Sequence, residues 1–340
     1  MTEQSVVQTD SLQPFSDNWK WRLSSKAIWI GLVFLLLILI LFTTISVDGF
    51  WKARSLWSLA RTGLLFPALL VPAMILVVAS GGVDLSVGAV AGVVSVVMAS
   101  LMASGTSPAV ALLVGLLLGT LVGLVNGLLV GLARVHGAVA TFGMMVLLRG
   151  VVLVVTEGRT IAVGDVGFLG SLAVPGLVLA LLLIIGVIVL TELAPFARKR
   201  FFGLRDGGSW LQRLALTGLP YVLSGVMAGL AGACYVGIIR YGTIATGSGL
   251  EAEVLLIVFL GGTALGGGLV NGLGAILAVL TFAVSKHILM LSNQPYARLE
   301  IIKGVGLLVF GLLCQLYYML IDWIFRRAQS KETSVADNHE

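Results

Sequence analysis

Two polar side chains, a carboxylate and a hydroxyl, interrupt a long apolar segment in the run Gly81-Gly82-Val83-Asp84-Leu85-Ser86-Val87-Gly88. At membrane depth, an interrupted backbone is tolerated only where it is buried in protein or lines a water-filled cavity. A carboxylate in hydrocarbon is costly and indicates a functional site. We interpret this stretch as the hinge and polar point of a transport pathway, with four candidate residues: Gly81, Gly82, Asp84 and Ser86.

A second interpretation exists for the two polar residues of this stretch. Asp and Ser at a helix start accept hydrogen bonds from free backbone amides, so Asp84 and Ser86 would cap the following helix. In the first interpretation they contact the transported substrate instead, and the positive end of the helix dipole faces that polar ligand. The sequence leaves both interpretations open.

A second glycine-rich interruption lies in the other half of the chain, within residues 259–268. Its candidate pathway residues are Gly261, Gly262 and Thr263. One glycine-interrupted helix in each half is the best sequence indication of a transporter's binding region. Val125-Asn126-Gly127 has an echo in Val270-Asn271-Gly272, but the spacing to the glycine pairs differs, and no internal repeat is established.

Single polar residues also occur within apolar segments. Arg149 is expected to face the interior of the helix bundle and to pair with a carboxylate or carbonyl, with Asp84 as a candidate partner; substrate contact is the alternative. Asn126, a further candidate along the pathway, and Asn271 are expected to form hydrogen bonds across helices rather than to bind a solute. Glycines that recur every four residues at Gly115, Gly119 and Gly123 favour close helix packing.

The composition places the chain in a membrane. Of its 340 residues, 58% are hydrophobic and 11% charged, and the mean hydropathy is +1.07. Soluble domains carry about 25% charged residues. The long apolar segments indicate helices, because a barrel strand would show only about ten alternating residues. The net charge of +5 comes from Lys and Arg residues beside apolar segments, where the positive-inside rule for membrane proteins places them. It therefore does not indicate binding to nucleic acid.

The sequence contains no sign of a bound cofactor. Cys234 and Cys314 lie in apolar stretches and suggest neither a disulfide nor a metal site. No Gly-x-x-x-x-Gly-Lys-Ser/Thr motif occurs, so we do not expect this chain to bind ATP through a P-loop. If ATP drives transport, the ATPase is expected to be another chain.

A length of about 20 apolar residues per crossing predicts an all-α, polytopic membrane protein with about ten transmembrane helices, some broken at glycine pairs. The predicted spans are 27–45, 62–79, 86–103, 108–133, 138–156, 173–194, 214–237, 253–265, 269–289 and 301–324. We expect residues 1–26 to form a cytoplasmic N-terminal segment, 27–325 the transmembrane domain, and 326–340 a disordered cytoplasmic tail.

Basic residues predict that both termini are cytoplasmic, because Lys and Arg cluster before the first span, after the last and in the central loop. One cluster disagrees, since it falls in the predicted external loop: Lys52, Arg54 and Arg61. The first apolar run is longer than the 7–15 residues of a signal peptide, so we expect it to remain as an anchor.

These motifs resemble the permease subunits of bacterial sugar ABC importers of the ribose, galactofuranose and autoinducer-2 group. The resemblance covers roughly residues 60 to 320. It is carried by the run from Gly81 to Gly88, by the segment from Ala140 to Gly150, by Tyr221-Val222-Leu223-Ser224-Gly225, and by Gly249-Leu250-Glu251-Ala252-Glu253 leading into Gly261-Gly262-Thr263.

The resemblance implies further site residues. Thr141 joins the residues of the substrate pathway and gate. Glu251 and Glu253 would meet an extracytoplasmic binding protein or act in gating, whereas composition alone favours a solvated loop. The central loop, which contacts the ATPase in such permeases, is shorter and more basic here; its candidate coupling residues are Arg198, Lys199, Arg200, Phe201, Arg205 and Asp206.

The implied function is translocation, without catalysis, of a sugar or related small polar solute across the bacterial inner membrane. Implied partners are ABC ATPase subunits, an extracytoplasmic solute-binding protein and a second permease copy, identical or related, in the lipid bilayer. Two alternatives remain. Branched-chain amino-acid ABC permeases usually carry asparagine-leucine-alanine in place of Asp84-Leu85-Ser86, and an ion-coupled secondary transporter would normally bury more ionisable residues.

Overall fold

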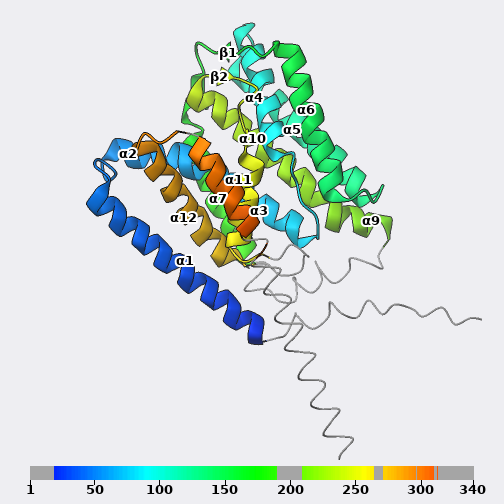
Figure 1. Ribbon diagram of the computed structural model, residues 1–340. Helices are drawn as coiled ribbons and strands as arrows, with labels where there is room; N and C mark the ends of the chain where they lie inside the picture. The colour runs from blue at the N-terminus through cyan, green and yellow to red at the C-terminus, as the bar shows by residue number, and fades with distance from the viewer. Residues whose placement is uncertain (1–18, 190–208, 264–270, 296, 310–311, 313–340) are drawn as a thin grey trace, which may run out of the picture. The chain divides into compact units, whose positions relative to one another are not determined.

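The chain folds into a set of apolar helices (Figure 1), seen in a computed structural model that describes residues 19–189, 209–263, 271–295, 297–309 and 312. The α-helices are α1 (Trp19–Ser46), α2 (Ala53–Ser58), α3 (Leu65–Ala79), α4 (Val87–Ala103), α5 (Pro108–Gly131), α6 (Gly137–Thr156), α7 (Ala173–Ile188), α9 (Trp210–Arg213), α10 (Leu219–Ile239), α11 (Leu250–Leu260) and α12 (Gly272–Leu291). The shorter elements are the π-helical turns η2 (Leu59–Leu64) and η5 (Leu214–Gly218), the 3-10 helix η3 (Gly167–Ser171), and the strands β1 (Ile161–Ala162) and β2 (Tyr241–Gly242).

The predicted polytopic, all-α architecture is confirmed. Six helices among the described residues are long and apolar enough to cross a membrane: Ile28–Ser46, Ala53–Ala79, Pro108–Gly131, Gly137–Thr156, Trp210–Ile239 and Gly272–Leu291. The helices α4 and α7 are shorter but also apolar. Within the described residues, every span predicted before residue 290 overlaps a helix, so apolar length located these elements.

The second predicted span begins earlier than expected, because η2 continues the helix from α3 back into α2. Arg54 and Arg61, which were assigned to an external loop, therefore lie in helical turns. The Arg61 guanidinium lies over the Trp57 ring, 5.8 Å from its centroid. Long basic side chains can lie along an apolar surface with their charged group in water. Arg54 and Arg61 therefore did not mark the end of a helix.

Both glycine pairs end a helix through the same backbone motif. After α3, the Gly81 and Gly82 amides donate to the Val78 and Val77 carbonyls. After α11, the Gly262 and Thr263 amides donate to the carbonyls of Phe259 and Val258 in the same register. Gly81 and Gly262 have φ of 84° and 87°, the left-handed conformation that this C-terminal motif requires and that glycine adopts without strain. The predicted interruptions are thus confirmed as helix ends.

The two halves repeat one order of elements. A short helix, a π-helical turn and a long helix occur as α2–η2–α3 and again as α9–η5–α10. A shorter helix and a long one follow each time, α4 then α5 and α11 then α12. In this order the connection 80–86 before α4 corresponds to the connection 240–249 before α11. The interruption at Gly261, which we paired with Gly81, instead corresponds to the connection after α4.

Close approach of α5 and α10 depends on their glycines. A Cβ atom added to Gly119 would lie 2.5 Å from the Gly225 carbonyl oxygen, and one added to Gly127 would lie 2.6 Å from the Gly218 oxygen. Backbones this close leave no room for a side chain, so the predicted packing role of the four-residue glycine spacing is confirmed.

A two-residue antiparallel ladder, which the sequence did not indicate, joins two connections. Ile161 pairs with Gly242 and Ala162 with Tyr241. It ties the chain after α6 to the chain after α10 (Figure 1).

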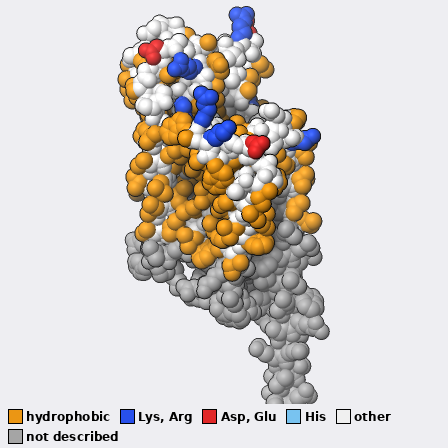
Figure 2. All heavy atoms as spheres, turned by 90° about the vertical axis from the view of Figure 1, so that its left-hand side faces the viewer, with side chains coloured by type: hydrophobic (Ala, Val, Ile, Leu, Met, Phe, Trp, Pro, Cys, Tyr) orange, Lys and Arg blue, Asp and Glu red, His pale blue; other side chains and the backbone are white. Residues whose placement is uncertain are grey.

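The side chains on the face shown in Figure 2 form an apolar zone, with Lys, Arg, Asp and Glu gathered toward one end. On α1, Ile30 and Phe34 are 71% and 65% exposed. Contiguous exposed apolar surface of this kind fits contact with lipid.

Residues from Pro295 onward form a separate unit, whose described part is helical over 297–309. Much of the tenth predicted span, 301–324, and the tail 326–340 lie outside the described residues, as does most of the segment 1–26. Residues 19–26 of that segment are already helical as the start of α1.

Gly119→Ala tests the α5–α10 contact. The added methyl group overlaps the Gly225 carbonyl, and overpacking of this kind costs about 1–3 kcal/mol. We expect a lower melting temperature for the purified protein in detergent. Gly143→Ala in α6 is the matched control, because nothing lies within 4 Å of its Cβ position. Equal melting temperatures for the two variants would contradict the proposed packing.

Candidate functional site

The connection between α3 and α4, residues 80–86, is held by a buried chain of hydrogen bonds around Asp84. The Ser86 amide and the Ser86 hydroxyl both donate to Asp84 Oδ1, at 2.9 and 2.6 Å. The Asn126 side-chain amide of α5 donates to Ser86 Oγ at 2.9 Å. All three residues are at most 2% exposed. A connected network of this kind fixes the turn in one conformation.

Thr141 of α6 holds the same connection from another side. Its hydroxyl accepts the Leu85 amide at 3.0 Å and lies 2.8 Å from the Gly137 oxygen and 3.2 Å from the Val83 oxygen. The Leu85 amide and the Val83 carbonyl, which belong to no helix, thereby find a partner inside the protein. Backbone groups at membrane depth need such partners.

Tyr221 of α10 fills the space that two glycines leave open beside the connection. Cβ atoms at Gly82 or Gly137 would overlap its hydroxyl group, and the ring is fully buried. The Tyr221 hydroxyl reaches the Val83 oxygen at 3.5 Å. Thus the two glycines of the pair differ in role: Gly81 supplies the positive φ, whereas Gly82 leaves room for Tyr221.

The capping interpretation of Asp84 and Ser86 is wrong, because neither side chain accepts a free amide of α4. Ser86 is the residue before α4, but its side chain makes no cap hydrogen bond. Asp84 instead accepts the Ser86 amide, two residues on, and so orders the turn that enters the helix. Both side chains are buried, so in this conformation they stabilise the connection and are not open to a solute.

Two further polar groups beside this network have no hydrogen-bond partner of normal geometry among the described residues. They are Asn126 Oδ1 and the Ser224 hydroxyl, both buried. Ser224 of α10 nevertheless lies close enough to the Asp84 carboxylate to interact with it electrostatically.

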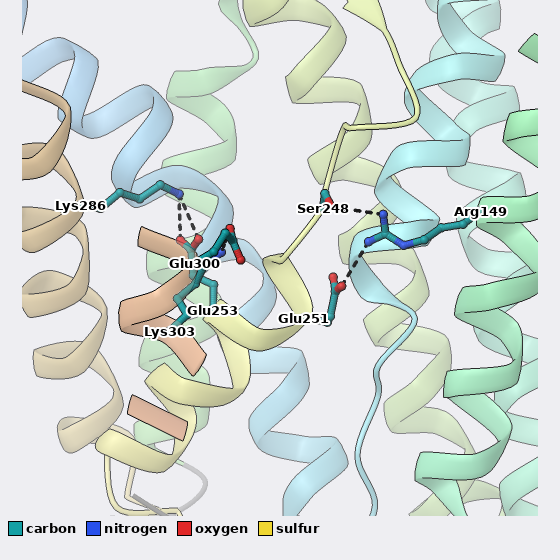
Figure 3. Close-up of polar contacts among 7 residues, drawn as sticks. All are labelled: Arg149, Ser248, Glu251, Glu253, Lys286, Glu300 and Lys303. Carbon is teal, nitrogen blue, oxygen red and sulfur yellow. Dashed lines mark hydrogen bonds and ion pairs between the residues drawn. The ribbon is translucent and has the colours of Figure 1, made fainter. Parts of the chain in front are cut away.

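Arg149 pairs with Glu251, which corrects the expected pairing with Asp84. Its Nη2 atom lies 3.1 Å from Glu251 Oε1, and its Nη1 atom lies 3.4 Å from Ser248 Oγ (Figure 3). Arg149 lies eight residues beyond Thr141 on α6, which is about 12 Å of helix. Because Thr141 touches the Asp84 connection, Arg149 is too far along the helix to reach it.

The two glutamates at the start of α11 are not a solvated pair, which corrects the composition-based interpretation. Glu253 is 2% exposed, and both of its carboxylate oxygens accept from Lys286 Nζ of α12, at 3.0 and 3.1 Å (Figure 3). Glu251 turns the other way, toward Arg149 of α6. The first turn of α11 is therefore held by one ion pair on each side.

The second glycine interruption does not meet the first. Gly261 packs against the start of α12, where a Cβ atom would lie 2.7 Å from the backbone of Ala275. Thr263 is 2% exposed, and its hydroxyl has no partner among the described residues. The six candidate coupling residues, Arg198, Lys199, Arg200, Phe201, Arg205 and Asp206, lie outside the described residues.

The sequence reasoning missed Tyr221, Ser224, Ser248 and Lys286 as site residues. Tyr221 and Ser224 stood in one of the motifs that carried the resemblance, which was the available signal. Lys286 had none, because its partner Glu253 is distant in the sequence. Within the described ranges, no three His, Cys, Asp or Glu side chains are grouped as a metal site would require.

Comparisons with known proteins find several related permeases. The chain is 30% identical to an L-arabinose ABC transporter permease protein of Azospirillum brasilense, over 87% of this chain and 89% of that protein. It is 32% identical to a galactofuranose transporter permease protein of Escherichia coli, over 71% and 74%. It is 28% identical to a ribose import permease protein of Bacillus subtilis, over 82% and 90%. No family model and no solved structure matches it.

Gly82→Ala tests the contact between the connection and Tyr221. The added methyl group overlaps the phenol oxygen, so we expect a loss of about 1–3 kcal/mol in the stability of the purified protein. Tyr221→Phe removes that oxygen, and the double variant should recover at least half of the loss. Thermal melting of the four proteins measures this. A double variant with the summed loss of the two single ones would contradict the assigned contact.

Proposed function

The chain belongs to the permease subunits of bacterial sugar ABC importers, and we propose that it moves a sugar or related small polar solute across the inner membrane as their membrane-spanning subunit. The likeness to the L-arabinose permease over most of both chains carries this assignment. Permeases of this family translocate and are not enzymes, so hydrolysis of ATP falls to a partner chain. Nothing favours the amino-acid permease or the ion-coupled transporter over this assignment.

The partners follow from the family. Such permeases work with ATPase subunits and with a solute-binding protein. In our proposal two copies of this chain, or this chain and a related permease, form the membrane channel. In this proposal both termini and the central loop face the cytoplasm, where the coupling residues meet the ATPase: Arg198, Lys199, Arg200, Phe201, Arg205 and Asp206. We further propose that this chain works without a cofactor of its own.

The path opens at the helix interruptions, by rigid-body movement of packed helices between two states. The connection 80–86 joins α4 to its neighbours through Asp84, Ser86, Asn126 and Thr141, so a shift of α4 relative to α5 and α6 breaks or exchanges these hydrogen bonds. The interruption at Gly261, Gly262 and Thr263 supplies the second hinge, and Glu251 and Glu253 gate the path through their ion pairs.

An affinity pull-down in mild detergent tests the assignment. We expect ATPase subunits at one copy per membrane subunit, together with the binding protein. The purified complex, placed in liposomes, should import the solute of that binding protein only when ATP is supplied. The assignment would be contradicted if the chain is purified without an ATPase and its transport depends on an ion gradient.

Asp84→Ala tests the connection in transport. It leaves the two Ser86 donors without their acceptor in a buried site, at about 1–3 kcal/mol for each unpaired group. We expect ATP-driven uptake to fall at least tenfold at equal amounts of assembled complex, and Asp84→Asn, which keeps an acceptor oxygen, to be milder.

Asp165→Ala is the matched control for this experiment. Asp165 accepts the amide of Gly167 in the same two-residue turn, but on the exposed surface. It should transport like the parent protein. Unchanged uptake and unchanged coupling to ATP hydrolysis in both Asp84 variants would remove Asp84 from the mechanism.

A further inference from the structure

Arg149 is charged, partly exposed and deep within a membrane-crossing helix. It follows Gly137 by twelve residues of α6, about 18 Å along the axis, in a hydrocarbon core of about 30 Å. Its side chain is 27% exposed in the single chain. A charged side chain at such depth faces a bundle interior or a water-filled cavity, because exposure to lipid is costly. This surface of α6 is therefore not a lipid contact.

The connection 240–249 leads to the same conclusion independently. Its inner side is pressed against α4: a Cβ atom at Gly92 would lie 2.8 Å from the Thr246 oxygen, and one at Gly247 would overlap the Gly88 carbonyl. Its outer side exposes Ala245 and Ser248. Irregular backbone at the depth of the α4 start is tolerated beside water but not beside lipid.

A small cleft lies between these elements. Its lining residues come from α4, from α6 and from the connection: Ala89, Gly92, Val93, Arg149, Val152, Ile244 and Thr246. Arg149, one of these lining residues, also bonds Ser248 and Glu251 (Figure 3). Through Arg149, the mostly apolar cleft adjoins a group of hydrogen-bonding side chains.

The chemistry of this group suits a neutral solute with several hydroxyl groups. The guanidinium group carries five N–H donors in one plane, and Glu251 and Ser248 accept hydrogen bonds. Glu251 Oε2 is buried and has no hydrogen-bond partner among the described residues. The guanidinium and carboxylate charges balance each other, so the site neither attracts nor repels a charged solute strongly, whereas adjacent hydroxyl groups can bind both partners.

We propose that Arg149, Ser248 and Glu251 form a contact site for hydroxyl groups of a neutral sugar on the wall of the translocation path. This inference rests on the proposed function as a sugar permease. It places the path along the surface shared by α4, α6 and the connection 240–249. The buried network around Asp84 then holds the start of α4 in place. The solute contacts lie on the side of α4 that faces α6 and the connection 240–249.

Thiol labelling of Ser248→Cys tests the site in the assembled complex. The background is Cys234→Ala with Cys314→Ser, and the reagent is a charged methanethiosulfonate that reacts only with thiols in water. Arg159→Cys, beyond the end of α6 and 79% exposed, is the positive control. Val154→Cys, also 79% exposed but apolar and within α6, is the control for a dry surface.

We expect Ser248→Cys to react within tenfold of the rate for Arg159→Cys, and Val154→Cys to react at least a hundredfold more slowly. L-arabinose, ribose or galactose at high concentration, without binding protein, should slow the Ser248→Cys reaction at least threefold. Arg149→Gln in the same background should abolish this protection by sugar but not the labelling.

Two results would overturn the proposal. One is a Ser248→Cys that reacts as slowly as Val154→Cys. The other is labelling that none of the three sugars slows. Neither result depends on an uptake assay, so a complex that imports its solute with an unreactive Ser248→Cys would refute this inference and leave the proposed function standing.

Discussion

The pairing of irregular backbone inside a membrane is the constraint on which the rest of this structure depends. Wherever a helix stops at membrane depth, its free amides and carbonyls need partners in the protein or water. The connection 80–86 finds them in protein: Thr141 takes the Leu85 amide and Asp84 takes the Ser86 amide. Glycines make this possible, because Tyr221 and the neighbouring helices can approach the backbone closely.

The connection 240–249 meets the same constraint in another way. Its inner side is closed by Gly88 and Gly92 of α4, and its outer side exposes Ala245 and Ser248. The first connection thus has its polar side chains Asp84 and Ser86 buried, whereas the corresponding one in the second half exposes a polar side chain. Because both lie against the first turn of α4, a movement of that turn changes both at once. This gives a physical basis for a path that opens by the movement of a few packed helices.

The ion pairs of α11 add a second layer to this arrangement. Glu251 is bound to α6 and Glu253 to α12, so the first turn of α11 joins an element of the first half to one of the second. Buried pairs of this kind do not by themselves stabilise a fold strongly, because removing two charges from water is costly. Here the two ion pairs orient the first turn of α11, because each carboxylate faces one cation on a different helix.

Apolar length and the glycine pairs predicted the order of the long described helices and the interruptions at Gly81 and Gly262, but not the continuation of α3 through η2 into α2. The resemblance added Thr141, which does contact the Asp84 connection. The pairing of Arg149 failed because one sequence does not show which helices are neighbours: Arg149 pairs with Glu251, and it lies about 12 Å along α6 from Thr141, which contacts the Asp84 connection. The partners of Glu251 and Glu253 were out of reach for a similar reason, since each lies on a distant helix. Tyr221 was named only as part of a motif of the resemblance, and its contact with the connection depends on the space beside Gly82 and Gly137, which the sequence does not show.

Hydrogen exchange of the Leu85 and Ser86 amides in the assembled complex tests the central claim most directly. Both amides are paired with buried side chains in the present conformation. We predict strong protection at rest, and faster exchange of the peptide covering 80–86, together with that covering 243–249, when nucleotide and loaded binding protein drive the transport cycle. Exchange that stays equally slow in both peptides throughout turnover, while other segments respond, would contradict a path that opens at these connections.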